Sequence, residues 1–303
     1  MLRLLAAVAL AVCSATLPAQ QPSPVSPDAA DIMARVAANQ DRSEAERAHY
    51  TYIQHAHVTS RSGKTIRCEE TTDSRVTPSP TGSAQQLLKL DGRVLVKHKY
   101  VAYNQPMKHS DHGPGDQQGV DVGLGLGDNN FDRELAEDLR HGLTQSKTRD
   151  GIGKGLFPLT SIAQADYSFR LIGRERMNGR DVFHLTFVPK EGTDGSWKGD
   201  AYIDAGAYQP VVVRTAMAHN IPFAVRTLLG TSLPGLGFTV IYAPQPGGIW
   251  FPVSFGTEFK LHIFFFFNRQ ITLAAENRDF EQTHVNSKVI PAQSANSMPA
   301  PQP

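Results

Sequence analysis

The chain has 303 residues, of which 40% are hydrophobic, and a formal net charge of +1 at pH 7. A charge this close to zero, without a basic stripe that carries interleaved aromatic residues, gives no indication of a nucleic-acid partner. The length is typical of a globular protein with one large domain or two small ones.

The first residues have the order of a secretory signal peptide. A short basic head is followed by an apolar run from Leu4 to Leu17, which is too short to cross a membrane, and Ala19 fits the last residue before cleavage. We therefore predict a signal peptide over residues 1–19 and a periplasmic or secreted protein. The residue before Cys13 is a valine where lipid attachment requires a small residue, so lipid anchoring at Cys13 is not expected. The alternative is a buried N-terminal helix.

A proline- and serine-rich linker over residues 20–30 follows the predicted signal. Asp28 or Asp31 has the side chain of a helix N-cap, and the pattern predicts a helix that continues to about Arg47. Beyond it, we expect a single domain over residues 31–290 and a disordered polar tail over residues 291–303.

Most of the remaining sequence predicts antiparallel strands joined by short turns. Asp91-Gly92 and Asn178-Gly179 are dipeptides favoured in two-residue hairpin turns. Residues 195–215 alternate between two strand faces and turn at Ala205-Gly206-Ala207. The acidic pair Glu69-Glu70 places its carboxylates on opposite faces of a strand, which favours solvation over glycoside chemistry.

A glycine-rich insertion interrupts the strands at about residues 101–160. Within it, an apolar residue recurs every four positions, which predicts a helix with a single apolar stripe. The glycines on either side, within 123–127 and 151–155, lack the spacing of a nucleotide-binding loop and are better interpreted as hinges. The stripe consists of Phe131, Leu135, Leu139 and Leu143.

Catalytic motifs are not evident. His109, Asp111 and His112 form a tight cluster of metal-ligand types and could hold part of a zinc site, but the sequence nearby does not complete the site, and solvated side chains are the preferred interpretation. His55 and His57 share one face of a strand and are expected to be exposed. Cys68 is interpreted as a buried strand residue rather than a nucleophile. We expect no cofactor, no bound metal and no enzymatic activity.

The later strands are unusually apolar. The run Ile263-Phe264-Phe265-Phe266-Phe267 places large side chains on both faces of one strand, so both faces must be covered. A curved sheet of this composition needs a helical lid or an apolar guest on its concave side. The alternative is a core filled by the protein's own side chains.

The stretch "RMNGRDVFHLTFVPKEGTDGSWKGDAYIDAGAYQPVVVR", the later "GGIWFPVSFGTEF" and the final "ENRDFEQ" resemble periplasmic lipoprotein carriers, the LolA-like and LolB-like proteins and their RseB-like sensor relatives. The resemblance covers roughly residues 167–282. It implies a mainly β (α+β) fold: a strongly curved antiparallel sheet that forms an open, incomplete β-barrel, with helices covering the concave side.

The resemblance also implies a non-enzymatic protein of the cell envelope that binds a lipid or a lipidated protein by holding acyl chains in an apolar concavity. The helix at 131–143 would be the lid. Two alternatives remain open: a periplasmic sensor or scaffold of the same fold that binds an envelope protein partner, and a metal-dependent enzyme built on His109, Asp111 and His112. The candidate cavity residues are Phe183, Leu185, Phe187, Trp197, Ile203, Trp250, Phe264 and Phe266.

Overall fold

The computed structural model describes eight segments of the chain. They are residues 27–79, 82–107, 131–144, 157–193, 197–218, 231–232, 236–263 and 267–283. The predicted signal peptide, most of the linker, the C-terminal tail and much of the insertion at 101–160 lie outside the described residues.

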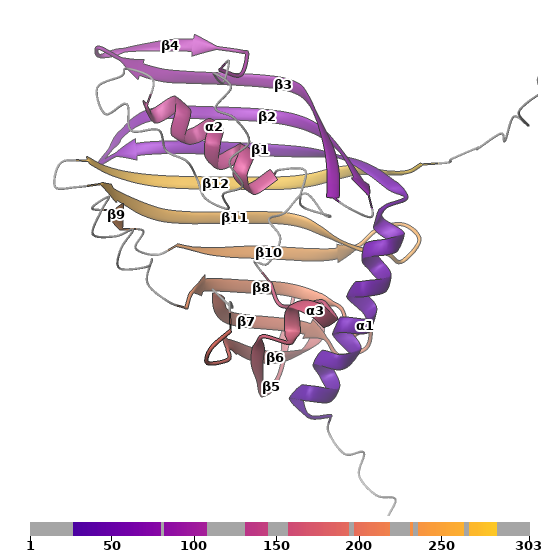
Figure 1. Cartoon of the computed structure of the whole chain (residues 1–303). Coiled ribbons are helices and arrows are strands. Elements are labelled where there is room, and N and C mark those ends of the chain that lie inside the picture. Colours follow the sequence, from indigo (N-terminus) through magenta and orange to yellow (C-terminus); the bar gives the residue numbers. More distant parts are fainter. Residues whose placement is uncertain are drawn as a thin grey trace, which may run out of the picture.

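The described strands form one antiparallel sheet of 12 strands (Figure 1). Along the sheet the order is β4-β3-β2-β1-β12-β11-β10-β8-β7-β6-β5, and the short β9 pairs with β11. The strands are β1 (Tyr50–Ser62), β2 (Thr65–Ser79), β3 (Gly82–Val96), β4 (Lys99–Tyr103), β5 (Tyr167–Met177), β6 (Arg180–Pro189), β7 (Trp197–Asp204), β8 (Pro210–Met217), β9 (Thr231–Ser232), β10 (Gly237–Pro244), β11 (Trp250–Ile263) and β12 (Phe267–Gln282).

The sheet is open. Its edge strands, β4 and β5, lie at opposite ends of the strand order, and no pairing between them closes the described strands into a barrel. The described helices lie on one side of the sheet (Figure 1). They are α1 (Ala29–Arg47), α2 (Phe131–Thr144) and α3 (Ser161–Gln164). The predicted fold class, an open antiparallel sheet with helices over one face, is confirmed.

Helix α1 begins where the sequence predicts. The Asp28 side chain accepts a hydrogen bond of 2.8 Å from the backbone N–H of Asp31, which is the usual N-cap arrangement. The helix buries Ile32, Met33 and Val36 against the sheet and ends at Arg47. Among the described helices, none is both long and apolar enough to cross a membrane.

The turn at Asn178-Gly179 is confirmed, because both residues have positive φ (50° and 78°) and join β5 to β6. The predicted turn at Asp91-Gly92 is wrong, since β3 runs through both residues without reversing. The reversal comes later, at Lys97 and His98, with φ values of 45° and 67°.

Gly92 has a different structural role from the predicted one. It pairs with Tyr103 across β3 and β4, and a Cβ added at Gly92 would lie 2.2 Å from Cζ of the Tyr103 ring. Only a residue without a side chain lets the ring lie over the strand at this point. The glycine therefore accommodates a neighbouring side chain and does not mark a turn.

Candidate functional site

The face of the sheet that carries the helices, called here the inner face, is crossed by an uninterrupted row of side chains. Direct cross-strand pairs connect each member of the row to the next over ten strands, from β5 to β3. All but the first are buried, and all but Thr72 are apolar. The row is Leu171, Leu185, Ala201, Val213, Val240, Phe255, Ala275, Ala56, Thr72 and Leu90.

Several of the predicted cavity residues lie on this face. Phe183 pairs with Ile203, Leu185 belongs to the row, and Phe187 lies one inner-face position further along β6. These four side chains are at most 2% exposed. The structure therefore brings them together in one cluster that is covered, and their role in binding stays a prediction.

The other predicted cavity residues are placed differently. Trp197 is half-buried, and its ring system makes an edge-to-face contact with Phe238, with 5.3 Å between ring centroids. Trp250 is buried at the start of β11, where Arg47 of α1 donates a 2.8 Å hydrogen bond to its carbonyl. Phe264 and Phe266 lie outside the described residues.

Helices α1 and α3 cover the inner face over β5–β8, a region called here the apolar end. Both helices contact β5 and each other. Ile32, Met33 and Val36 of α1 share one hydrophobic cluster with Phe183 and the neighbouring inner-face residues. Asn39 of α1 donates hydrogen bonds to the carbonyls at the β7–β8 turn. The N-terminal half of α1 is therefore an apolar cover, whereas its C-terminal half buries Gln40 and Ser43, which form hydrogen bonds with Gln209 next to β8.

Helix α2 covers the other half of the inner face, over β1–β4 and the neighbouring parts of β11 and β12. Its N-terminal stripe packs on a separate hydrophobic cluster of the sheet. The predicted stripe residues Phe131, Leu135 and Leu139 are buried there, whereas the side chain of Leu143 lies outside the described part. The contact residues of the sheet are Phe259, Leu261 and Ile271.

The part of the inner face under α2, which extends over β1–β4 and the adjoining β12 and is called here the charged end, carries buried ionisable groups. The carboxylate of Glu70 is fully buried and accepts a 2.5 Å hydrogen bond from Arg140 Nε of α2. Its other oxygen accepts a hydrogen bond of 3.2 Å from the hydroxyl of Tyr103. A buried carboxylate needs such partners, because desolvation of an unpaired charge is costly.

A second arginine of α2 joins the same network. Arg133 donates to Glu137 four residues later, and its guanidinium lies over the Tyr103 ring, 3.8 Å from the centroid. Glu137 also accepts a 2.8 Å hydrogen bond from the backbone N–H of Met107. Helix α2 is thus attached to the β4 edge by charges as well as by its apolar stripe.

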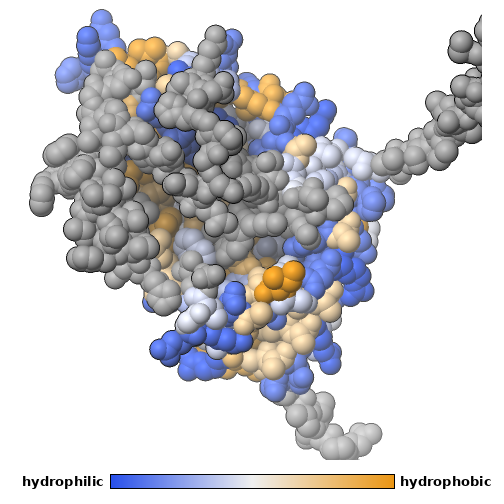
Figure 2. Space-filling view, in the orientation of Figure 1, coloured by the Kyte–Doolittle hydropathy of each residue, from blue (hydrophilic) through white to orange (hydrophobic). Residues whose placement is uncertain are grey.

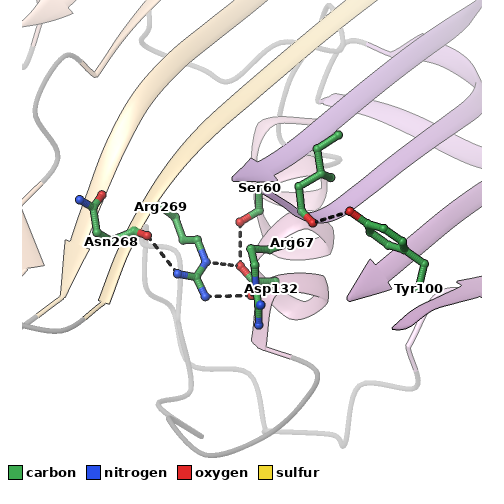
Figure 3. Close-up of polar contacts among 7 residues, drawn as sticks. Ser60, Arg67, Tyr100, Asp132, Asn268 and Arg269 are labelled. Atoms are coloured by element: carbon green, nitrogen blue, oxygen red, sulfur yellow. Dashed lines mark hydrogen bonds and ion pairs between the residues drawn. The ribbon is translucent and has the colours of Figure 1, made fainter. Parts of the chain in front are cut away.

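Near its N-terminus, α2 is attached through Asp132 (Figure 3). The Asp132 carboxylate accepts hydrogen bonds from Arg269 Nε at 2.5 Å and Arg269 Nη2 at 3.0 Å. Ser60 Oγ donates to it at 2.8 Å, and Arg67 Nε at 3.4 Å. This carboxylate, 7% exposed, therefore lies in a nearly dry pocket of donors.

Cys68 is buried in β2, which confirms the expectation of a structural residue. Burial raises the pKa of its thiol to about 12, although the Tyr103 hydroxyl, 3.3 Å from Sγ, acts in the opposite direction. Burial likewise raises the pKa of Tyr103 far above its usual value. Both groups stay protonated at neutral pH, so the thiol has no nucleophilic character here.

The opposite, outer face carries histidine–carboxylate pairs. His55 Nδ1 lies 2.7 Å from Asp73 Oδ1, and His57 Nε2 lies 3.1 Å from Glu69 Oε1. Both histidines are partly exposed, in agreement with the expectation, and both have a carboxylate partner that the sequence did not reveal.

An open groove of about 590 Å³ at the β2–β4 edge is lined by Glu69, Thr71, Asp91, Gly92, Arg93, Ala102, Tyr103 and Asn104.

The sequence missed the charged contacts of α2. Glu70 does lie on the face opposite Glu69, but the expectation that it is solvated is wrong, because it pairs with Arg140 under the helix. Asp132 and Arg269 are 137 residues apart. The available signal was local: within the predicted helix, Asp132 and Arg140 stand directly next to stripe residues, where full solvation is difficult.

The predicted metal cluster is not placed by the structure, since His109, Asp111 and His112 lie outside the described residues. Within the described part of the chain, no three histidine, cysteine or acidic side chains gather in a way that could hold a metal ion.

Comparisons with known proteins give structural matches only. No family model matches the chain, and no curated protein matches it either. Among solved structures, a DUF1329 family protein from Desulfovibrio piger has 9% identity and a TM-score of 0.37, covering 84% of this chain and 94% of its own.

Two further structures carry the name of the family that the sequence resembles. A putative outer membrane lipoprotein-sorting protein domain from Vibrio parahaemolyticus is 12% identical, with a TM-score of 0.36 and coverage of 84% of this chain and 94% of its own. A LolA superfamily protein from Nitrosomonas europaea is 10% identical, with a TM-score of 0.35 and coverage of 87% and 97%. Structural similarity at this level does not allow a ligand, a partner or a residue role to be assigned to this chain.

Proposed function

We propose that this chain is an exported, non-enzymatic protein of the cell envelope that binds a lipid or the lipid chains of a lipidated protein on the inner face of its sheet. The observation that carries the proposal is the row of paired side chains that crosses ten strands from Leu171 to Leu90, interrupted by only one polar residue, Thr72. An extended acyl chain requires apolar surface that is continuous in this way.

The cover over part of this row supports reversible access. Helix α2 contributes four described apolar side chains, Phe131, Leu135, Ala136 and Leu139, to clusters with the sheet, and it also makes ionic contacts through Asp132 and Arg140. Charged groups regain hydration when such a contact opens, so opening costs less than exposing an equal area of apolar core. We assign α2 the role of the lid.

Burial of an acyl chain would supply enough free energy for binding. Each buried methylene of an acyl chain contributes about 0.8 kcal/mol, so roughly a dozen methylenes provide about 10 kcal/mol before ordering costs. Binding in the micromolar range therefore remains within reach after those costs are subtracted.

The alternative is a sensor or scaffold that binds an envelope protein partner, with the inner face filled by its own side chains. A specific observation favours it: Phe183, Leu185, Phe187 and Ile203 are all at most 2% exposed. On the side shown in Figure 2, exposed apolar residues form small groups among hydrophilic ones, so they do not by themselves mark a partner surface.

The test is lipid capture followed by mapping. The full chain is secreted to the periplasm, purified without detergent and measured by native mass spectrometry before and after incubation with a diazirine-labelled phospholipid. We expect a discrete added mass, and photo-crosslinks to inner-face peptides that contain Phe255, Phe259 or Ile271.

Crosslinks confined to exposed apolar residues such as Leu88, Val188 and Ile241 would indicate non-specific adsorption and contradict the proposal. A bare polypeptide mass that lipid does not change would also contradict it, and would favour the sensor or scaffold. Both outcomes are read on the unmodified protein, so no variant has to fold for the test to decide.

A further inference from the structure

The contacts of the Asp132 carboxylate resemble those of a bound anion more than those of an ordinary surface ion pair. Three donor side chains on three different strands converge on one carboxylate: Ser60 from β1, Arg67 from β2 and Arg269 from β12 (Figure 3). All three belong to the sheet, whereas the carboxylate belongs to α2. The donors therefore belong to the sheet, and the Asp132 carboxylate that they bind belongs to the helix that covers the sheet at this point.

The chemistry of the receptor suits an oxyanion of a ligand. Arg269 presents two donors to the two carboxylate oxygens, the paired geometry in which a guanidinium recognises carboxylate and phosphate groups. Two guanidinium groups face a single carboxylate, so the pocket holds more positive than negative charge. The Arg67 side chain is 35% exposed, which leaves one side of the pocket next to solvent.

The pocket adjoins apolar surface. Ser60 pairs directly with Ile271 across β1 and β12, and Arg269 lies two residues before Ile271 on the same strand face. Successive residues on one strand face are about 7 Å apart. An anionic group in the pocket would thus lie next to the cluster of Phe259, Leu261 and Ile271, where an attached acyl chain can continue.

We propose that Ser60, Arg67 and Arg269 form a binding site for the oxyanion headgroup, phosphate or carboxylate, of an amphipathic acyl ligand, and that Asp132 occupies this site in the absence of ligand. The inference rests on the proposed function and specifies its ligand class. Because ligand and Asp132 compete for the same donors, headgroup binding releases the N-terminal attachment of α2 and couples ligand entry to lid opening.

The other attachment of α2 supplies a matched control. There the polarity is reversed: the sheet provides the carboxylate, Glu70, and the helix provides Arg140. Arg140→Gln loosens α2 without removing a donor from the anion pocket, whereas Arg269→Gln loosens α2 and removes the principal donor. The two variants share the effect on the lid and differ in the effect on the headgroup.

The experiment compares two ligands that differ by one phosphate, 1-lauroylglycerol 3-phosphate and uncharged 1-lauroylglycerol, by calorimetric titration into the full chain. We expect the wild type to prefer the phosphate ligand by about tenfold, the difference expected for charge-assisted hydrogen bonds. Arg140→Gln should keep this preference, and Arg269→Gln should abolish it while binding the uncharged ligand at least as well as the wild type does. Asp132→Asn should increase the preference.

The proposal is overturned if the wild type binds both ligands equally, or if Arg269→Gln and Arg140→Gln show the same preference. Should neither ligand bind any of the proteins, the lipid function fails, and the site is still tested with inorganic phosphate. Phosphate should then raise hydrogen exchange in α2 of the wild type beyond the effect of sodium chloride at equal ionic strength. No such rise, or an equal rise in Arg269→Gln, would refute the anion site.

Discussion

The two ends of the inner face are covered by helices in different ways. At the apolar end, Ile32, Met33 and Val36 of α1 pack in one cluster with Phe183, Leu185 and their neighbours, and buried amide and hydroxyl hydrogen bonds lie beside them. At the charged end, α2 lies over Glu70 and the Ser60–Arg67–Arg269 pocket, and ion pairs make up much of the contact. Salt weakens partly exposed ion pairs, which can also exchange for water or for another charge, whereas burial of apolar area is not screened in this way. If α2 is the lid as proposed, its ionic contacts should open more readily than the contacts of α1.

The largest effect is expected from a cavity at the apolar end. Leu185→Ala should lower the free energy of unfolding by about 2–5 kcal/mol, because Leu185 is fully buried within the row and its loss leaves a void. Urea denaturation followed by circular dichroism measures the change. Val188→Ala on the same strand, where the side chain is 50% exposed, should stay within about 0.5 kcal/mol. Equal effects of the two variants would contradict a rigid apolar end.

At the charged end, Glu70→Gln should lower the free energy of unfolding by about 1–3 kcal/mol, since it removes the charge of the buried carboxylate to which Arg140 donates. The larger signal should be local: hydrogen exchange in α2 should rise severalfold while exchange in α1 stays unchanged. If both helices lose protection together, the two covers are not independent and the comparison fails.

The edge of the charged end is tested at Gly92. Gly92→Ala should cost about 1–3 kcal/mol, because the new Cβ would meet the Tyr103 ring and push it away from Glu70 and Cys68. Gly173→Ala is the matched control in another strand, since nothing lies within 4 Å of a Cβ at that position. Thermal unfolding of both variants measures the difference in their stability. Similar melting temperatures would exclude the proposed steric role of Gly92.

The smallest effect is expected at Asp204, in the turn that contacts α1. Burial by itself raises its pKa, but hydrogen bonds from the N–H groups of Ala207 and Gly206 and from Arg180 outweigh burial and hold the pKa below its ordinary value. A carboxyl with a lowered pKa contributes stability above its unfolded pKa and loses it as pH falls through the folded pKa. Asp204→Asn should therefore cost about 1 kcal/mol at pH 7 and progressively less below pH 4. A cost that does not vary with pH between 7 and 3 would show that the charge is irrelevant.

Local patterns predicted much of the fold. The cap at Asp28, the stripe from Phe131 to Leu139 and the turn at Asn178-Gly179 each depend on residues close in sequence, and each is confirmed. The run Phe183, Leu185 and Phe187 also shares one face, as strand alternation requires.

The failures have a common physical cause. Asp91-Gly92 has the composition of a turn, yet the packing of Tyr103 from the next strand determines what the glycine does. Glu70 and Asp132 are buried because arginines far away in the sequence neutralise them. Whether a charged residue is solvated depends on tertiary partners, and neither composition nor periodicity contains that information.

The pairing of β1 with β12 has a consequence for the order in which the molecule folds. Tyr50 lies opposite Gln282, so the centre of the sheet joins the first described strand to the last. The β1–β4 meander has only local pairings and can form early, but its β1 edge stays unpaired until β12 arrives. Contacts of such long sequence separation form slowly. A chain made from its N-terminus would therefore present an open strand edge until β12 is complete, and it should be most prone to aggregation in that interval.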